Sequence, residues 1–213
     1  IDRYLIGFLL GDGGIRYSLG FTTPDQFIID YIEKLGYTIK KQSIYGYSIQ
    51  IKKDPNNYNS LGKELFEEFK RFEFIGKYSY EKSIPDELKY DSITNRLKLL
   101  QGLMDSDGYC CKKGKCSFTS SSQKLAQDVA WLARSLGYKV NIYGPLKSSY
   151  RKNGIKIECK DHYDVFITGN DKSQLFTLPR KKNRTNNFAT NKKVIKSIVP
   201  DIVAPATCIE VDN

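Results

Sequence analysis

The chain has 213 residues and a formal net charge of +10, because 34 Lys and Arg outnumber 24 Asp and Glu. Hydrophobic residues account for 40% of it and charged residues for 27%, which is typical of a globular protein with a buried core. The positive charge favours a polyanionic partner, nucleic acid first and an anionic membrane surface second. No apolar run approaches the length of a membrane span and no signal peptide is evident, so we expect no membrane association.

The cysteine content indicates the redox environment. Five cysteines are an odd number, which argues for free thiols and for a reducing, intracellular compartment such as the cytoplasm, the nucleoid or an organelle matrix. Cys159 and His162 suggest a metal site with Cys110 and Cys111, but the spacing matches no standard zinc pattern, and buried strand cysteines are the better interpretation. Because the sequence starts at Ile1, we expect a processed product or an excised piece of a longer protein.

The first part of the chain alternates helical and strand patterns. Helices are predicted over 2–11, 25–35 and 61–72, short strands over 14–17 and 19–22, and a hairpin of two strands over 38–44 and 47–53. In the hairpin, Ile49 and Ile51 point one way and the polar residues between them point the other way. The loop at 54–57 separates this hairpin from the third helix.

The second part repeats the first. Phe21-Thr22-Thr23 recurs as Phe118-Thr119-Ser120, and Leu35-Gly36-Tyr37 recurs as Leu136-Gly137-Tyr138. Strands are predicted over 109–111, 116–119, 139–143, 155–159 and 163–168, with a hairpin turn at 152–154 and a helix over 123–136 that is one turn longer than its counterpart. We infer a tandem duplication and an α+β fold, in which helices cover one face of antiparallel sheets.

Two apolar helical stretches carry the strongest repeat. The stretches are 5–13 and 100–108. Each has small residues four positions apart, Gly7 and Gly11 in the first and Gly102 and Ser106 in the second. Such residues form a flat strip along which two helix backbones approach closely, so we expect the two helices to pack on each other.

Each stretch ends in an Asp followed by a Gly, Asp12 in the first copy and Asp107 in the second. A carboxylate at a helix C-terminus faces the negative end of the helix dipole, and two at adjacent ends repel each other. A shared divalent cation relieves both effects, which favours a metal site over two simple Asp-Gly turns. We predict Mg²⁺, or another divalent cation such as Mn²⁺ or Ca²⁺, held by both carboxylates and by the backbone carbonyls of Gly11 and Ser106.

These paired stretches resemble the motif of the LAGLIDADG homing endonucleases, and the resemblance extends over nearly the whole chain. It implies two αββαββα units related by a pseudo-twofold axis, with the motif helices at the central interface and the antiparallel sheets forming a saddle for DNA. We divide the chain into an N-terminal LAGLIDADG half, 1–88, a C-terminal half, 89–200, and a tail, 201–213.

The resemblance also implies a lysine near each catalytic Asp. Lys82, in Lys82-Ser83-Ile84-Pro85, matches the lysine of the family and is expected to orient the attacking water. For the second lysine we consider 181 and 182 and assign catalysis to Lys182, while Lys53 and Lys160 remain alternatives. Asp105 stands where the first copy has Leu10, and it is expected to be accessory at most.

The outward positions of the predicted strands are basic or polar, as suits ribbons that enter the DNA major groove. The expected DNA contacts on them are Arg16, Lys40, Gln42, Gln50, Lys52, Lys113, Lys115, Lys139, Asn141 and Lys156. The basic run 178–184 adds Arg180 and Lys181 as contacts to the phosphates.

The end of the chain, 206–213, resembles the start of the final splicing-domain strands of inteins, although no splicing nucleophile or terminal His-Asn pair is present. The resemblance as a whole implies a site-specific, Mg²⁺-dependent double-strand DNA endonuclease from an intein. Two motif copies in one chain imply a monomer, one per target duplex, on a long asymmetric site. The alternatives are an RNA maturase that assists intron splicing and a non-cleaving DNA-binding protein of the same fold.

Overall fold

The computed structural model describes residues 1–51 and 61–186 together with residues 195, 197 and 199. The predictions made for Lys52, Lys53, the loop 54–57 and the tail 201–213 lie outside the described residues. Within the described part, no helix is long and apolar enough to cross a membrane.

The first half begins with helix α1, Arg3–Asp12, which the Asp2 carboxylate caps by accepting the Leu5 N–H at 2.9 Å. Its other elements are β1 (Gly13–Gly14), β2 (Gly20–Thr22), α2 (Gln26–Lys34), β3 (Ile39–Lys41), β4 (Gly46–Ile49) and α3 (Leu61–Arg71). The strands form one antiparallel sheet in the order β1-β2-β4-β3.

The second half begins with α5, Ile93–Ser106, and builds its sheet in the matching order β5-β6-β10-β7. Its elements are β5 (Gly108–Cys110), β6 (Cys116–Ser120), α6 (Gln123–Ser135), β7 (Lys139–Leu146), β8 (Ser149–Lys152), β9 (Ile155–Glu158), β10 (His162–Thr168), η2 (Lys172–Leu175) and α7 (Pro179–Lys182). Between the halves lie η1 (Ser79–Glu81) and α4 (Asp86–Lys89). The common strand order confirms the predicted α+β fold of two repeated units.

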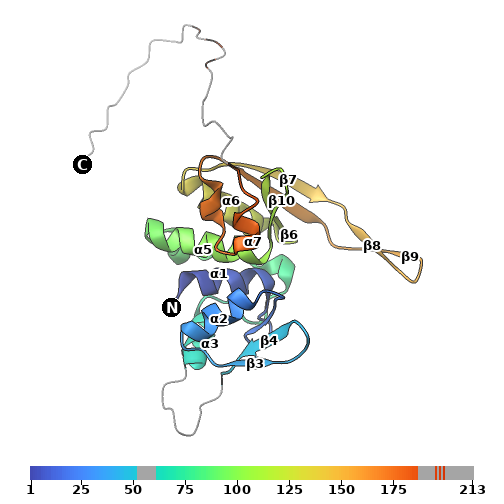
Figure 1. The fold of residues 1–213 in the computed structure, drawn as a ribbon. Helices are drawn as coiled ribbons and strands as arrows, with labels where there is room; N and C mark the ends of the chain where they lie inside the picture. Colours follow the sequence, from blue (N-terminus) through green and yellow to red (C-terminus); the bar gives the residue numbers. More distant parts are fainter. Residues whose placement is uncertain (52–60, 187–194, 196, 198, 200–213) are drawn as a thin grey trace, which may run out of the picture.

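The helices α1 and α5 lie side by side at the centre of the molecule, and each half extends away from them (Figure 1). Residues Tyr4 to Gly11 of α1 are all buried, because the helix is enclosed by α5 and by its own sheet. On the covered face of the second sheet, Phe118, Val165 and Ile167 pack into the core. Among the described residues, no helix covers the opposite face of either sheet (Figure 1).

The structure differs from the predicted elements in two places. Strand β8 is missing from the prediction because all four of its residues are exposed, so it has no apolar alternation to detect. Together with β9 it forms a two-stranded ribbon that projects from the body of the second half (Figure 1). The last helix of the described residues is only the single turn α7, whereas the first half ends in the eleven-residue α3. The extra turn predicted for the helix over 123–136 is confirmed, since α6 has 13 residues and α2 has 9.

Candidate active site at the helix interface

The small residues of the two repeated stretches put the backbones of α1 and α5 in direct contact. A Cβ atom added to Gly7 would lie 2.2 Å from the Leu99 carbonyl oxygen, and one added to Gly102 would lie 2.1 Å from the Tyr4 carbonyl oxygen. No side chain fits into such a space without moving a helix. The predicted close approach of the two helices is therefore present in the structure.

This packing brings the two acidic helix ends together. Asp12 is the last residue of α1, and Asp107 is the C-terminal cap of α5. Both residues are exposed on their solvent side, but the neighbouring helix ends exclude much of the water around their carboxylates. Burial, followed by the charge of Asp107, raises the pKa of Asp12 to about 6. Burial likewise raises the pKa of Asp107. The site thus holds two carboxylates that disfavour each other's charge.

Lys82 supplies a buried cation at the end of α1. Its ammonium group donates to the carbonyl oxygen of Gly11 at 2.9 Å and to that of Gly13 at 3.4 Å. The segment that carries it is anchored to α6, because the Ser122 hydroxyl donates to the Lys82 carbonyl at 2.6 Å. Burial lowers the pKa of Lys82, while the charges of Asp107 and Asp12 oppose that shift.

Lys181 supplies the equivalent cation at the end of α5. The prediction from the sequence that Lys182 occupies this position is wrong, because the structure places Lys181 there. The Lys181 ammonium donates to the carbonyl oxygens of Met104, Asp105, Ser106 and Gly108, at distances from 2.6 to 3.2 Å. Burial lowers its pKa to about 8. Lys182 is exposed.

The side chains of the two lysines point in different directions. Lys181 lies with Leu178 on the side of α7 that faces the core, whereas Lys182 points to solvent. Both residues lie about one turn after Leu178, at three and four positions, so the helical period of the sequence does not separate them.

Asp105 also has a larger role than predicted. It is buried, and its Oδ2 atom accepts hydrogen bonds from the Tyr4 hydroxyl at 2.9 Å, the Thr177 N–H at 2.9 Å and the Leu178 N–H at 3.0 Å. The Thr177 hydroxyl donates to the same atom. Burial raises the pKa of Asp105, and these hydrogen bonds oppose the shift. The carboxylate thereby ties the segment that leads into α7, and with it Lys181, to the motif helix.

The residues present fit a divalent cation of the hard, oxygen-binding type. Within the described chain no group of three or more His, Cys, Asp and Glu side chains forms a metal site, so the suggested cluster of Cys110, Cys111, Cys159 and His162 does not assemble. Two carboxylates with waters and phosphate oxygens are nevertheless a common shell for Mg²⁺. The carbonyls of Gly11 and Ser106, predicted as ligands, each accept a hydrogen bond from a lysine ammonium.

Several of the predicted DNA contacts lie on the strands of the two sheets or in the loops beside them. In the first sheet Gln42 donates to the Ser48 hydroxyl at 2.9 Å, and Ser48 pairs across the strands with Lys40. Gln50 donates to the same hydroxyl at 3.5 Å. In the second half, the exposed residues from this set are Lys113 and Lys115 in the β5–β6 turn, Lys139 and Asn141 on β7, and Lys156 on the β8–β9 ribbon.

Three predicted DNA contacts are engaged within the protein. Arg180 forms an ion pair with Asp25, with Nε 2.8 Å from Oδ1 and Nη2 2.7 Å from Oδ2. It therefore joins the end of the second half to the start of α2. Lys181 is buried at the active site, as described above. The guanidinium of Arg16 is half-buried and stacks 4.0 Å from the centre of the Tyr78 ring.

Comparison with known proteins places this architecture in a family. The model of the homing endonuclease family matches residues 83–195, just over half of the chain. The chain belongs to this family. Solved structures of the homing endonuclease I-DmoI have the same fold. One set of mesophilic variants gives a TM-score of 0.51 at 15% identity over 82% of this chain and 90% of that chain. The complex with DNA and Ca gives 0.50 at 14% identity over 85% and 94%.

Several curated proteins are similar to part of the chain. The replicative DNA helicase DnaB of Mycobacterium intracellulare is 34% identical over 138 residues, which is 62% of this chain and 23% of that protein. An ATP-dependent DNA helicase of Thermococcus kodakarensis is 35% identical over 126 residues, 54% and 11% respectively. The homothallic switching endonuclease of Saccharomyces cerevisiae is 30% identical over 100 residues, 44% and 17%. The chain thus spans less than a quarter of the length of these relatives.

Proposed function

We propose that this homing endonuclease chain is a site-specific nuclease that hydrolyses both strands of a DNA duplex and requires a divalent cation, with Mg²⁺ as the physiological ion. The observation that carries the proposal is the meeting of Asp12 and Asp107, one from each half, at two helix ends that also bury Lys82 and Lys181. Four charged groups in this arrangement serve no packing purpose, because apolar residues would stabilise the same interface without desolvating charge.

In this proposal, charged side chains of the protein bind the cation and offset the negative charge of the DNA phosphates. Asp12 and Asp107 would each serve one strand, and together they would hold the cation. The bound cation supplies an activated water and neutralises charge on the phosphate. Lys82 and Lys181 keep the two ends of the motif helices in place and reduce the repulsion that a phosphate would meet there. Two carboxylates line the site in the described part of the chain, so waters and phosphate oxygens would complete the shell of the ion, and DNA should strengthen metal binding.

The proposed partner is double-stranded DNA, bound by one copy of the chain. The two open sheet faces flank the active site, one in each half, which suits a target longer than either half alone. The second half carries the additional β8–β9 ribbon, so the two half-sites are read differently and the target is asymmetric. The solved complexes of I-DmoI with target DNA support this choice of partner through the common fold.

We further propose that the chain is the endonuclease domain of an intein and acts in a reducing intracellular compartment. Similarity limited to 23% of one DNA helicase and 11% of another is expected of a domain carried inside larger proteins. Free thiols at Cys110, Cys111, Cys116 and Cys159 suit a reducing environment.

The decisive experiment incubates the protein and Mg²⁺ with a randomised duplex library and sequences the cut ends. Wild-type protein is expected to yield one family of cut sites. Asp12→Asn and Asp107→Asn should each slow double-strand cleavage by several orders of magnitude. Both variants should still bind the selected site in Ca²⁺. Asp86→Asn, at an exposed position of α4 where the carboxylate pairs with Lys89, is the charge-matched control and should cut normally. Normal double-strand cleavage by either active-site variant would overturn the assignment, and preferential binding of RNA hairpins would favour a maturase.

A further inference from the structure

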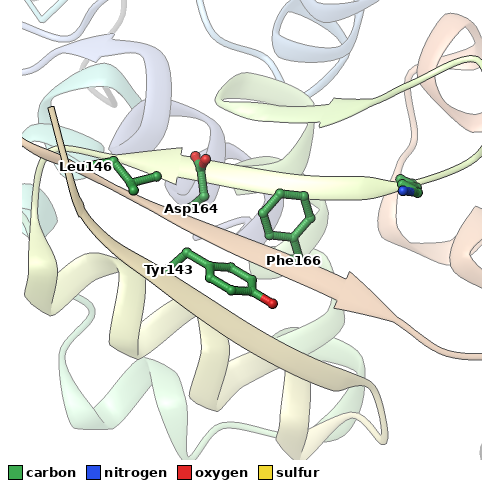
Figure 2. Close-up of a pocket in the computed structure, with 5 residues that line it drawn as sticks. Tyr143, Leu146, Asp164 and Phe166 are labelled. Carbon is green, nitrogen blue, oxygen red and sulfur yellow. The ribbon is translucent and has the colours of Figure 1, made fainter. Parts of the chain in front are cut away.

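A hollow on the open face of the second sheet combines an apolar wall with one carboxylate. Tyr143 and Leu146 from β7, Asp164 and Phe166 from β10, and Lys115 before β6 line a volume of about 520 Å³. Figure 2 shows the Asp164 carboxylate standing between Leu146 and Phe166, with the Tyr143 ring beside them. Tyr143 and Phe166 meet edge to face, their ring centres 5.6 Å apart. No helix of the described residues covers this face, so the hollow opens toward the proposed DNA.

The strand register explains why these side chains share one face. Asp164 lies opposite Thr119 of β6 and opposite Tyr143 of β7. Its neighbours in sequence, Tyr163 and Val165, point the other way, and Val165 is fully buried in the core. The position of the carboxylate on the open face is therefore set by the sheet and not by a mobile loop.

The stability of the fold does not explain a carboxylate at position 164. Asp is disfavoured in the middle of a strand. Its Oδ1 atom accepts from the Thr119 hydroxyl at 2.6 Å, while Oδ2 accepts no hydrogen bond from the described residues. None of the described Lys or Arg side chains forms an ion pair with it. A negative charge on a face that meets DNA is repelled by phosphates, and this cost is offset only where a base edge offers a hydrogen-bond donor.

We propose that this hollow is a base-reading subsite for cytosine in the DNA major groove, an assignment that rests on the proposed function. Cytosine presents its N4 amino donor beside the apolar C5 edge, whereas adenine presents its N6 donor beside the N7 acceptor. The free Oδ2 of Asp164 accepts from N4, and the rings of Tyr143 and Phe166 cover the C5 edge. The Thr119 hydroxyl holds the other carboxylate oxygen, so the acceptor keeps its direction.

The first half of the protein lacks this subsite, so only the second half would recognise cytosine in this way. Thr22 occupies the place of Thr119 in the repeat, and the residue opposite it across the strands is Gly46. Gly46 has no side chain to reach a base. The cytosine preference should therefore occur in only one half of the target, on the side bound by the second half of the protein.

The experiment selects bound duplexes from a randomised library in Ca²⁺, where binding is read without cleavage, and repeats the selection by cleavage in Mg²⁺. Wild-type protein should prefer cytosine at one position of one half-site by roughly 10- to 100-fold. Asp164→Asn should lose that preference and keep the others, and Asp86→Asn should keep all of them. Equal Tm values for the three proteins show that the variants are folded.

Two substituted targets isolate the contact. At the selected position, 5-methylcytosine and thymine carry the same C5 methyl group but differ in N4, so wild-type protein should bind the 5-methylcytosine duplex normally and the thymine duplex at least 10-fold more weakly. An unchanged preference in Asp164→Asn, or a uniform change at every position, would overturn the subsite while leaving the nuclease assignment intact. A wild-type protein that selects no DNA sequence overturns both.

Discussion

The two halves of the molecule place the same charge in the same location by different means. In the first half, Lys82 arrives from the segment between η1 and α4, which the Ser122 hydroxyl fixes to α6 of the other half. In the second half, Lys181 arrives from the single-turn helix α7, which Asp105 of the motif helix fixes at Thr177 and Leu178. The comparison teaches that the repeat preserves the helix ends and their charges, whereas the supporting contacts have diverged.

Among the changes that separate the two halves, substitution of the lysines has the largest expected effect. Lys82→Met and Lys181→Met each remove one buried cation while keeping a side chain of similar length. Because preorganised charge at such a site contributes roughly 10²- to 10³-fold to the rate, each variant should slow its own strand by about that factor and accumulate nicked duplex. Strand-resolved gel assays measure this. Lys182→Met, the exposed neighbour, should cut both strands normally. If Lys182→Met were the impaired variant, the placement of Lys181 at the site would be wrong.

The interface between α1 and α5 is common to both halves, so disturbing it should slow cleavage of both DNA strands equally. Gly7→Leu places a side chain where even a Cβ atom lies 2.2 Å from the Leu99 carbonyl oxygen. Overpacking should cost roughly 1–3 kcal/mol or more and displace Asp12 and Asp107 together. Denaturation in urea measures the first effect, and cleavage of both strands at equally reduced rates measures the second. Gly137→Ala, in the turn after α6, meets no atom within 4 Å, but its φ of +87° strains an alanine, so this control should lose stability and leave both cleavage rates unchanged.

Asp105 offers a way to disturb one half only. Asp105→Leu installs the residue found at the same motif position of the first copy, and it removes the acceptor for the N–H groups of Thr177 and Leu178. Buried donors left unpaired cost about 1–3 kcal/mol each, so α7 should loosen and the strand served by Lys181 should be cut more slowly than the other. Tyr4→Phe removes only one of the donors to Asp105, so it should cost less stability. The ratio of the cleavage rates of the two DNA strands should stay the same. Equal slowing of both strands by Asp105→Leu would contradict the anchoring role.

The smallest expected effect concerns the repulsion between the two acidic helix ends. The pKa of Asp12 is about 6 in the folded protein and 3.8 in the absence of structure, so the folded state binds the proton more tightly. Stability contributed by this group is present below pH 4 and is lost as the pH rises through about 6. After allowance for solvent screening, removing the charge should stabilise the metal-free protein by about 1 kcal/mol, roughly 2–4 °C in Tm.

Thermal melts of Asp12→Asn and wild-type protein in EDTA test this effect. The variant should melt higher at pH 7.5 and should differ less at pH 5, where wild-type Asp12 is largely protonated. Adding Mg²⁺ together with the target duplex should stabilise the wild-type protein more than the variant. A lower Tm for Asp12→Asn at pH 7.5 in EDTA would show that the two carboxylates do not repel each other in the folded protein.

The sequence by itself determined the repeat, the two motif helices and the two helix-terminal carboxylates. These features follow from local chemistry: apolar residues at helical spacing, small residues four apart, and an Asp-Gly pair at the end of each stretch. The order of helices and strands in each half was also predictable, because its apolar periodicity changes from helical to alternating at each boundary. The predicted strand ends were less accurate, since the apolar pattern of the first hairpin extends beyond the residues that pair as β3 and β4.

Only the tertiary structure decided which side chains support the site. Lys181 and Lys182 are adjacent in one basic run. Lys181 is buried and Lys182 is exposed, because α7 turns the first toward the core and the second toward solvent. Arg180, in the same run, is taken by Asp25, which lies far away in sequence. Asp105 and Asp164 were not identifiable as an anchor and as a candidate base reader, because each role depends on groups brought to them by another strand or segment. Contacts across such long sequence separations leave no local pattern, so only the folded chain reveals them.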